Sequence, residues 1–157
     1  KARLILSEWV LKHQSVIVDY YQEIENTAAS KEGRKIKQLV LGDVLAIVTP
    51  FALQKTVLKS ILRRAGVPMK NLTIGTVHAL QGAERAIILF STVYGANMAG
   101  NAFFYDMGPN MLNVAVSRAK NSFILFGHAP LYQDRLSTTP STLLYKHISH
   151  FESKISS

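Results

Sequence analysis

The sequence predicts an α/β fold in which helices cover both faces of a parallel sheet. Residues 44–48 are continuously apolar, as in a strand that is buried on both faces, and residues 86–93 are apolar enough to lie in the middle of a sheet. Segments with helical spacing of apolar residues lie between such runs, and strands that alternate with helices are typical of a parallel sheet. A length of 157 residues suffices for one domain with a sizeable core. We therefore expect residues 1–157 to form a single domain.

Two helices are expected before the first strand. Residues 2–13 and 16–30 both repeat their apolar side chains near the helical period. Residues 31–35 then interrupt the second pattern with charge and glycine. An exposed basic loop is therefore predicted after the second helix.

A further helix is predicted over 51–65, and Gly66 ends it. Its expected core side consists of the apolar residues at helical spacing, which are Leu53, Val57, Leu58, Ile61, Leu62 and Ala65. Lys55, Lys59 and Arg63 form a row along the same helix. We interpret this row as a solvated helix face, with a phosphate-binding track as the alternative.

The rest of the chain continues the alternation of strands and helices. The remaining expected strands are 72–77, 86–93 and 122–127. Glycine and asparagine predict a long surface loop over 94–110. The remaining expected helices are 110–120 and 143–151.

The chain is basic, and its net charge of +8 favours a polyanionic partner such as nucleic acid or nucleotide phosphate. A soluble surface that happens to be basic is the alternative. The absence of cysteine excludes disulfides, zinc–thiolate sites and thiol catalysis. The chain begins with Lys1 and lacks a signal-peptide pattern, so we expect it to be part of a longer protein.

The usual motifs of a complete nucleotide site are missing. Gly95 and Gly100 have the spacing of a phosphate-binding loop, but Asn101 and Ala102 stand where that loop requires Lys and Ser or Thr. No other glycine-rich phosphate loop and no Gly-x-Ser-x-Gly nucleophile motif occurs. By itself, the chain therefore lacks a cradle for a triphosphate.

Two histidines near the end of the chain offer a weak metal-site hypothesis. His147 and His150 have the i,i+3 spacing of a helical ligand pair. No third ligand lies nearby in the sequence, so surface histidines are the preferred interpretation and no metal site is predicted.

The segment 73–120 contains two polar clusters that follow apolar runs. Gln81, Gly82 and Glu84 follow a strand, and parallel sheets place ligand sites at the carboxyl ends of their strands. Gly82 allows close approach of a ligand, and Glu84 offers an acceptor suited to ribose hydroxyls. An ordinary turn between strands explains Gln81 and Gly82 almost as well.

The second polar cluster lies on the helix predicted over 110–120. Its apolar arc consists of Leu112, Ala115, Val116 and Ala119. Arg118 falls at the border of this arc, where an arginine can bury its stem and extend its guanidinium toward phosphate in a cleft. The alternative is an ordinary surface arginine.

Three segments in order resemble the conserved motifs of superfamily 1 helicases. Residues 44–54 resemble motif IV, 76–84 motif V and 112–120 motif VI. The resemblance is to the branch that contains the nonsense-mediated-decay RNA helicase and its DNA-helicase relatives. It implies a second RecA-like domain, of the P-loop NTPase type, that lacks its own Walker A motif.

The resemblance also implies roles in an ATP site shared with an N-terminal RecA-like domain, which would supply the Walker A lysine and hold Mg²⁺. Arg118 would be the arginine finger that stabilises charge on the transferring phosphoryl group. Glu84 would bind the ribose, and Gln81 and Gly82 would lie near the γ-phosphate. Met111 stands where relatives often carry a basic residue, so a second phosphate contact is not expected from this position.

A single strand of DNA or RNA is the second implied ligand. The residues expected to face it are Thr49, Pro50, Thr76, Val77 and His78. Residues 14–42 match no motif and are expected to be a family-variable insertion. These expectations describe half of an ATP-dependent helicase or translocase. The chain alone is expected to be inactive. The expected location is inside the cell, in the cytoplasm or in the nucleoid or nucleus.

Two alternatives to the motor function remain. One is a non-catalytic nucleic-acid-binding module that keeps the fold and the charge. The other is a structural or protein-interaction domain, whose behaviour would not depend on salt or nucleic acid.

Overall fold

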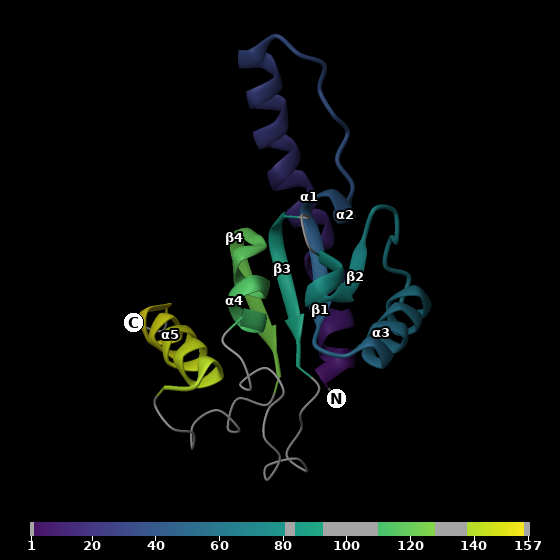
Figure 1. Ribbon diagram of the computed structural model, residues 1–157. Helices are drawn as coiled ribbons and strands as arrows, with labels where there is room; N and C mark the ends of the chain where they lie inside the picture. Colours follow the sequence, from purple (N-terminus) through teal and green to yellow (C-terminus); the bar gives the residue numbers. More distant parts are fainter. Residues whose placement is uncertain (1, 81–83, 93–109, 128–137, 156–157) are drawn as a thin grey trace.

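The computed structural model describes residues 2–80, 84–92, 110–127 and 138–155, which build a four-stranded sheet (Figure 1). The strand order is β2-β1-β3-β4, and every neighbouring pair is parallel. The strands are β1 (Leu45–Thr49), β2 (Thr73–Thr76), β3 (Arg85–Ser91) and β4 (Ala119–Phe126). The predicted parallel sheet is confirmed.

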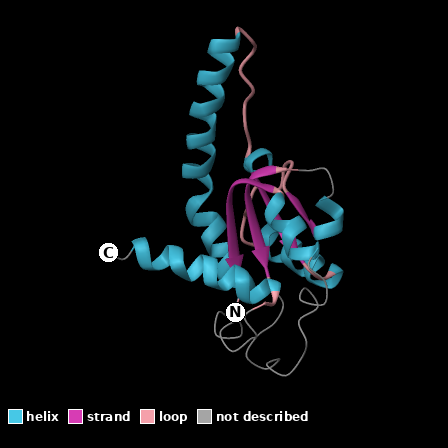
Figure 2. Cartoon of the chain, turned by 60° about the vertical axis from the view of Figure 1, so that its left-hand side comes forward, coloured by secondary structure: helices cyan, strands magenta, loops and turns pink. Residues whose placement is uncertain are grey.

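Helices lie on both faces of this sheet, as predicted (Figure 2). They are α1 (Ala2–Glu32), α2 (Leu41–Val44), α3 (Ala52–Arg64), the 3₁₀ turn η1 (Val77–Leu80), α4 (Asn110–Ser117) and α5 (Pro140–Ile155). Helices α1 and α3 pack against one face, and η1, α4 and α5 contribute to the core on the other.

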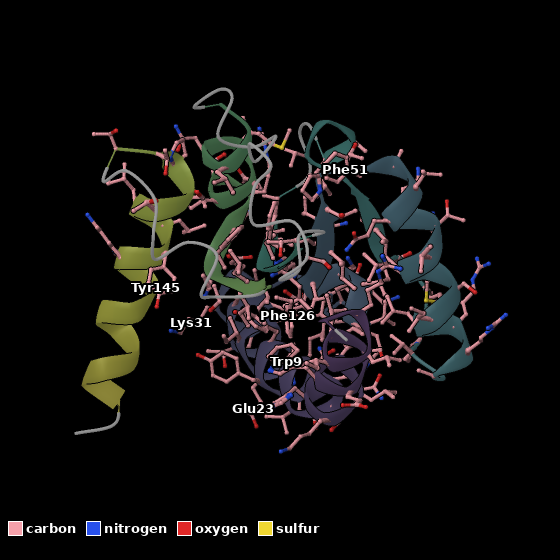
Figure 3. The ribbon with its side chains drawn as sticks, turned by 90° about the horizontal axis from the view of Figure 1, so that it is seen from below. Trp9, Glu23, Lys31, Phe51, Phe126 and Tyr145 are labelled. Atoms are coloured by element: carbon pink, nitrogen blue, oxygen red, sulfur yellow. The ribbon has the colours of Figure 1, made fainter. Side chains whose placement is uncertain are left out.

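The central strand β1 divides its side chains between two hydrophobic cores. Leu45 and Ile47 join the core under α1 and α3, whereas Ala46 and Val48 join the core under α4. All four are fully buried, because successive side chains of a strand point to opposite faces. This double burial explains the continuous apolar run. Figure 3 shows Trp9 of α1 near Phe126 of β4, whose ring it meets edge-on at 5.9 Å between centroids.

Helix α1 is one helix of 31 residues, so the prediction of two helices was wrong. No glycine or proline occurs within it, and the backbone therefore has no reason to leave the helix near residues 14–15. Gly33, with φ at 64°, follows its end in the left-handed conformation that glycine adopts readily. The predicted basic loop consequently begins only at this glycine.

The second half of α1 projects beyond the sheet, and residues 33–40 return along it to α2 (Figures 1 and 2). Gln22 Oε1 accepts the Leu39 amide proton at 2.8 Å, and the Glu25 carboxylate accepts from the Lys37 amide at 3.0 Å. Hydrogen bonds from Arg34 and from the Lys37 amide lower the pKa of Glu25 to about 2. We call residues 16–40 the stalk; it lies within the segment 14–42 that is expected to be an insertion.

Helix α3 has the predicted position but a different inner face. Leu58 and Leu62 are buried as predicted, whereas Leu53 is 85% exposed and Val57 is 37% exposed. Gln54 is buried instead, because its Nε2 donates to Ser91 Oγ at 2.8 Å. Gln54, Leu58 and Leu62 are spaced four residues apart and share the inner face of the helix, so Leu53 lies outside this face.

Helix α4 is shorter than the predicted helix 110–120. It ends at Ser117, and Ala119 already belongs to β4. The amide of Arg85 donates to Arg118 O, so the sheet ladder replaces the helix at that point. Val116 is 38% exposed rather than in the core, while Leu112 and Ala115 are buried as predicted.

The C-terminal helix and the long loop also differ from the predicted boundaries. Helix α5 begins at Pro140 rather than at residue 143. Asn110 begins α4, and the rest of the loop predicted over 94–110 lies outside the described residues. Within the described parts of the chain, no helix is both long and apolar enough to cross a membrane.

Candidate nucleotide and nucleic-acid site

The four described strands run in one direction, so they begin at one edge of the sheet and end at the opposite edge. We call these the amino edge and the carboxyl edge. Glu84 and Arg118 lie at the amino edge, directly before β3 and β4. Thr49 and Thr76 lie at the carboxyl edge, where β1 and β2 end. The predicted site residues therefore form two groups.

The position of Glu84 corrects one prediction, because the residue does not follow the carboxyl end of a strand. Strands β2 and β3 are both parallel to β1, so the chain must return from the carboxyl edge to the amino edge between them. The turn η1 directly follows β2, and Glu84 directly precedes β3. The segment 76–84 thus reaches both edges. Gln81 and Gly82 lie outside the described residues.

At the amino edge, the starts of β3 and β4 bring four charged residues together. The Arg85 amide donates to Arg118 O at 3.0 Å, next to the register pair Arg85–Ala119. Lys120 Nζ lies 3.3 Å from Glu84 Oε2. The two side chains are 61% and 52% exposed, and such solvated ion pairs are weak. Glu84 is therefore open to exchange its partner.

Arg118 combines a partly buried position with an unused donor. Its Nε is buried and has no hydrogen-bond partner among the described residues. A guanidinium is always charged and presents five donors, so it matches phosphate oxygens in geometry and charge. A buried unpaired donor costs free energy, and such atoms often mark the position of a ligand. The expected role of this arginine toward phosphate stays a prediction.

Arg85 is a residue that the sequence prediction missed. Its Nε donates to Gly42 O at 2.9 Å, and its Nη1 donates to Glu84 O at 2.9 Å. The position of Gly42 is itself fixed, since a Cβ there would lie 2.1 Å from the backbone of Asn71 and Leu72. Arg85 thus joins β3 to a tightly packed part of α2. The signal available in the sequence was an arginine directly after Glu84.

Asp43 connects the same edge to the stalk. Its carboxylate accepts from the Val40 amide at 3.0 Å, from Asn71 Nδ2 at 3.0 Å and from Lys37 Nζ at 3.2 Å. Burial opposes the charge, but the hydrogen bonds from these three residues outweigh it and lower the pKa of Asp43. The base of the stalk is consequently held by an ionised carboxylate.

At the carboxyl edge, the sheet register pairs Thr49 with Thr76. Thr76 is half-buried, whereas Thr49 is fully buried and Pro50 and Val77 are also buried. The backbone of His78 continues in η1. The structure therefore brings these predicted residues together from two strands, with several of their side chains enclosed.

A neutral polar cluster surrounds the carboxyl edge, and sequence reasoning did not find it. Besides the Gln54–Ser91 bond, Thr92 Oγ1 donates to Phe126 O at 3.2 Å. Gln54 Oε1 and Thr49 Oγ1 are buried and lack hydrogen-bond partners within the described residues. The available signal was the polar pair Ser91-Thr92 at the end of an otherwise apolar run.

Two further positions from the sequence have simple surroundings. Met111 is half-buried and packs against the core under α4, which accounts for an apolar side chain there. His147 is exposed on α5, and the side chain of its expected partner His150 lies outside those described. No group of three potential metal-ligating side chains occurs in the described portion of the protein.

Comparisons with known proteins give a consistent family. A family model described as an AAA domain matches residues 10–130. Regulator of nonsense transcripts 1 of Dictyostelium discoideum is 32% identical over 138 residues, which cover 82% of this chain and 10% of that protein. The probable RNA helicase armi of Drosophila melanogaster is 38% identical over 97 residues, which cover 59% of this chain and 8% of that protein.

A DNA helicase is also similar to the chain. DNA polymerase alpha-associated DNA helicase A of Schizosaccharomyces pombe is 29% identical over 83 residues, which cover 53% of this chain and 12% of that protein. The chain thus spans about a tenth of the length of these relatives. It belongs to the AAA domain family and is a RecA-like domain of the superfamily 1 helicase type, in the branch of the regulators of nonsense transcripts.

Proposed function

We propose that the chain is the C-terminal RecA-like motor domain of an ATP-dependent nucleic-acid helicase or translocase. The observation that carries this proposal is the buried, unpaired Nε of Arg118 at the amino edge, beside the exposed carboxylate of Glu84. A positively charged donor and an exposed acceptor at one edge suit a nucleotide, which has both phosphates and ribose hydroxyls. The helicase names of the relatives support the same function.

In this proposal the amino edge is one wall of an ATP site. ATP with Mg²⁺ supplies the transferable phosphoryl group, and an N-terminal RecA-like domain of the same protein holds the metal and the phosphates. Arg118 extends its guanidinium toward the phosphoryl group and stabilises the charge that develops during transfer, an effect worth about 10³ to 10⁵ in rate. Its unpaired Nε is the structural feature that fits an anionic group there.

Glu84 accepts hydrogen bonds from the ribose, after its solvated pairing with Lys120 is exchanged. Gln81 and Gly82 lie near the γ-phosphate and respond to its presence. Closure of the two domains on ATP completes the site, and reopening follows hydrolysis.

The carboxyl edge carries the proposed contact with single-stranded DNA or RNA. Thr76, which is half-buried, and His78 contact its sugar-phosphate backbone, and the buried Thr49, Pro50 and Val77 support this edge beside them. The register pairing of the two threonines supports a joint role. The net charge of +8 favours the approach of such a polyanion. Because the partners are ATP and nucleic acid, we place the protein inside the cell, in the cytoplasm or in the nucleoid or nucleus.

The decisive experiment compares Arg118→Ala with the unmodified full-length protein in an ATPase assay with DNA and with RNA. The expected result is a fall in kcat of about 10³-fold or more with nucleotide binding still measurable. Arg64→Ala, at the exposed end of α3, is the matched control and should keep the normal rate. A normal rate in Arg118→Ala would remove the main site assignment. Binding of nucleic acid without stimulated hydrolysis in the unmodified protein would favour a non-catalytic module.

A further inference from the structure

The ladder between β3 and β4 is irregular at the amino edge, next to the proposed nucleotide residues. Arg85 is paired with Ala119, but Ile87 is paired with Ser122, so β4 contains one extra residue between these pairs. Such bulges interrupt regular pairing, and they are common beside active sites, where they redirect side chains. The pairing that fixes Arg118 is therefore separated from the regular ladder.

Beyond this bulge, the backbone of Arg118 is held by the Arg85 amide, which donates to Arg118 O at 3.0 Å. The Arg118 amide bonds in turn to Ala115 O at 3.3 Å, at the end of α4. Because the adjacent pairing is irregular, the position of Arg118 depends on how firmly Arg85 itself is held.

The side chain of Arg85 supplies that anchorage. Its Nε donates to Gly42 O and its Nη1 donates to Glu84 O, each at 2.9 Å. Gly42 cannot shift toward Asn71, since there is no room even for a Cβ between them. A planar guanidinium fixes the direction of both bonds, which a flexible ammonium would not. One residue thus fixes the backbone of Glu84 on one side and that of Arg118 on the other.

We infer that Arg85 is a positioning residue for the proposed ATP hydrolysis, holding Glu84 and Arg118 in register across the bulge. The inference rests on the proposed function, and it adds a residue that contacts neither phosphate nor ribose. It also explains the bond from Arg85 to Gly42 O, because this bond connects the site to a closely packed part of the domain.

The test uses Arg85→Met in the full-length protein, because methionine keeps an apolar stem without the donors. A displacement of a catalytic group by about 1 Å can cost about 10²-fold in rate, so a fall of this order in kcat is expected. The urea midpoint of the variant and the fraction folded are measured in parallel, so that kcat refers to folded protein only. Arg64→Met is the matched control and should keep the normal kcat.

A double variant separates positioning from a merely structural role. If Arg85 acts through Arg118, adding Arg85→Met to Arg118→Ala should lower the residual kcat by less than about threefold. If the double variant instead lost kcat by the product of the two single losses, the two residues would act independently, and the inference would be overturned. A normal kcat in folded Arg85→Met would also overturn it while leaving the proposed function intact, whereas a normal kcat in Arg118→Ala would overturn the proposed function.

Arg85→Lys keeps the test decisive if Arg85→Met does not fold. Lysine retains the charge but cannot make the two directed bonds to Gly42 O and Glu84 O together. A clear loss of kcat with a normal urea midpoint is expected. Full activity of this variant would show that directed bonding is not required, and it would overturn the inference.

Discussion

The amino edge and the carboxyl edge of the sheet are both polar, but they differ in charge and exposure. At the amino edge, Glu84 and Lys120 are charged and half exposed. At the carboxyl edge, Gln54, Ser91 and Thr92 are neutral and at most 4% exposed. The amino edge thus presents charge to solvent, whereas the polar groups of the carboxyl edge bond within the domain.

The buried polar atoms without hydrogen-bond partners also differ in charge between the two edges. Arg118 Nε is a donor with a fixed positive charge, while Gln54 Oε1 is a neutral acceptor. A donor of this kind suits an anion, and a neutral acceptor suits a hydroxyl or an amine. Although residues 76–84 form one contiguous motif, they connect two edges with different chemistry.

The largest expected effect is at the amino edge, where Gly42→Ala should destabilise the domain by about 3 kcal/mol or more. A Cβ at this position would lie 2.1 Å from the backbone atoms Asn71 C and Leu72 N, which cannot move aside as a side chain can. The measurement is the free energy of unfolding in urea.

Gly66→Ala is the control for this substitution. Gly66 has φ at 82° but no atom within 4 Å of the added Cβ, so only backbone strain of about 1–2 kcal/mol is expected. Equal losses in the two variants would contradict the claim that close packing fixes α2 at the amino edge.

A smaller effect is expected from the buried pair at the carboxyl edge. Ser91→Ala should cost about 1–3 kcal/mol, because it leaves Gln54 Nε2 buried without a partner. Gln54→Leu removes both polar atoms of the side-chain amide, so the double variant should be less destabilised than the two losses combined. A double-mutant cycle in urea should give a coupling of about 1 kcal/mol.

The same cycle on Glu84→Gln and Lys120→Met tests the other edge. This pair is solvated, so its coupling should be below about 0.5 kcal/mol. A larger coupling between Glu84 and Lys120 than between Gln54 and Ser91 would contradict the proposed contrast, in which the amino edge is exposed and the carboxyl edge is buried.

The sequence predicted the sheet well because burial on both faces leaves an unmistakable pattern. The expected strand 44–48 differs from β1 by one residue at each end. Helix α3 was also found, since its buried Leu58 and Leu62 follow the helical period. Hydrophobic periodicity therefore suffices where apolar packing decides the structure.

The sequence failed where a polar residue takes a buried position. Leu53 was assigned to the core, but Gln54 is buried on the face of Leu58 and Leu62, where it bonds to Ser91, 37 residues away. The role of Arg85 was missed for the same reason, since its acceptor Gly42 O is 43 residues away. Arg118 was proposed through its motif, but its unpaired Nε is visible only in the folded chain.

The smallest expected effect is a difference in acid sensitivity between the edges. The pKa of Asp43 is lowered in the folded protein, so the folded state binds fewer protons than the unfolded state and gains stability from the ionised carboxylate. This contribution should be complete above the unfolded pKa of about 3.9 and should disappear as the pH falls through the lower folded value. The effect is small because burial offsets part of the benefit from hydrogen bonds.

Asp43→Asn should therefore reduce the loss of stability as the pH falls below the unfolded pKa of about 3.9, relative to the unmodified chain. Gln54→Leu is the matched variant at the carboxyl edge, and it should shift the whole curve without changing its slope, because the groups it affects do not titrate. Unfolding in urea at a series of pH values measures both curves. If the dependence of stability on pH changed in Gln54→Leu but not in Asp43→Asn, acid would be acting on the carboxyl edge. That result would contradict the assignment of charged groups to the amino edge and neutral groups to the carboxyl edge.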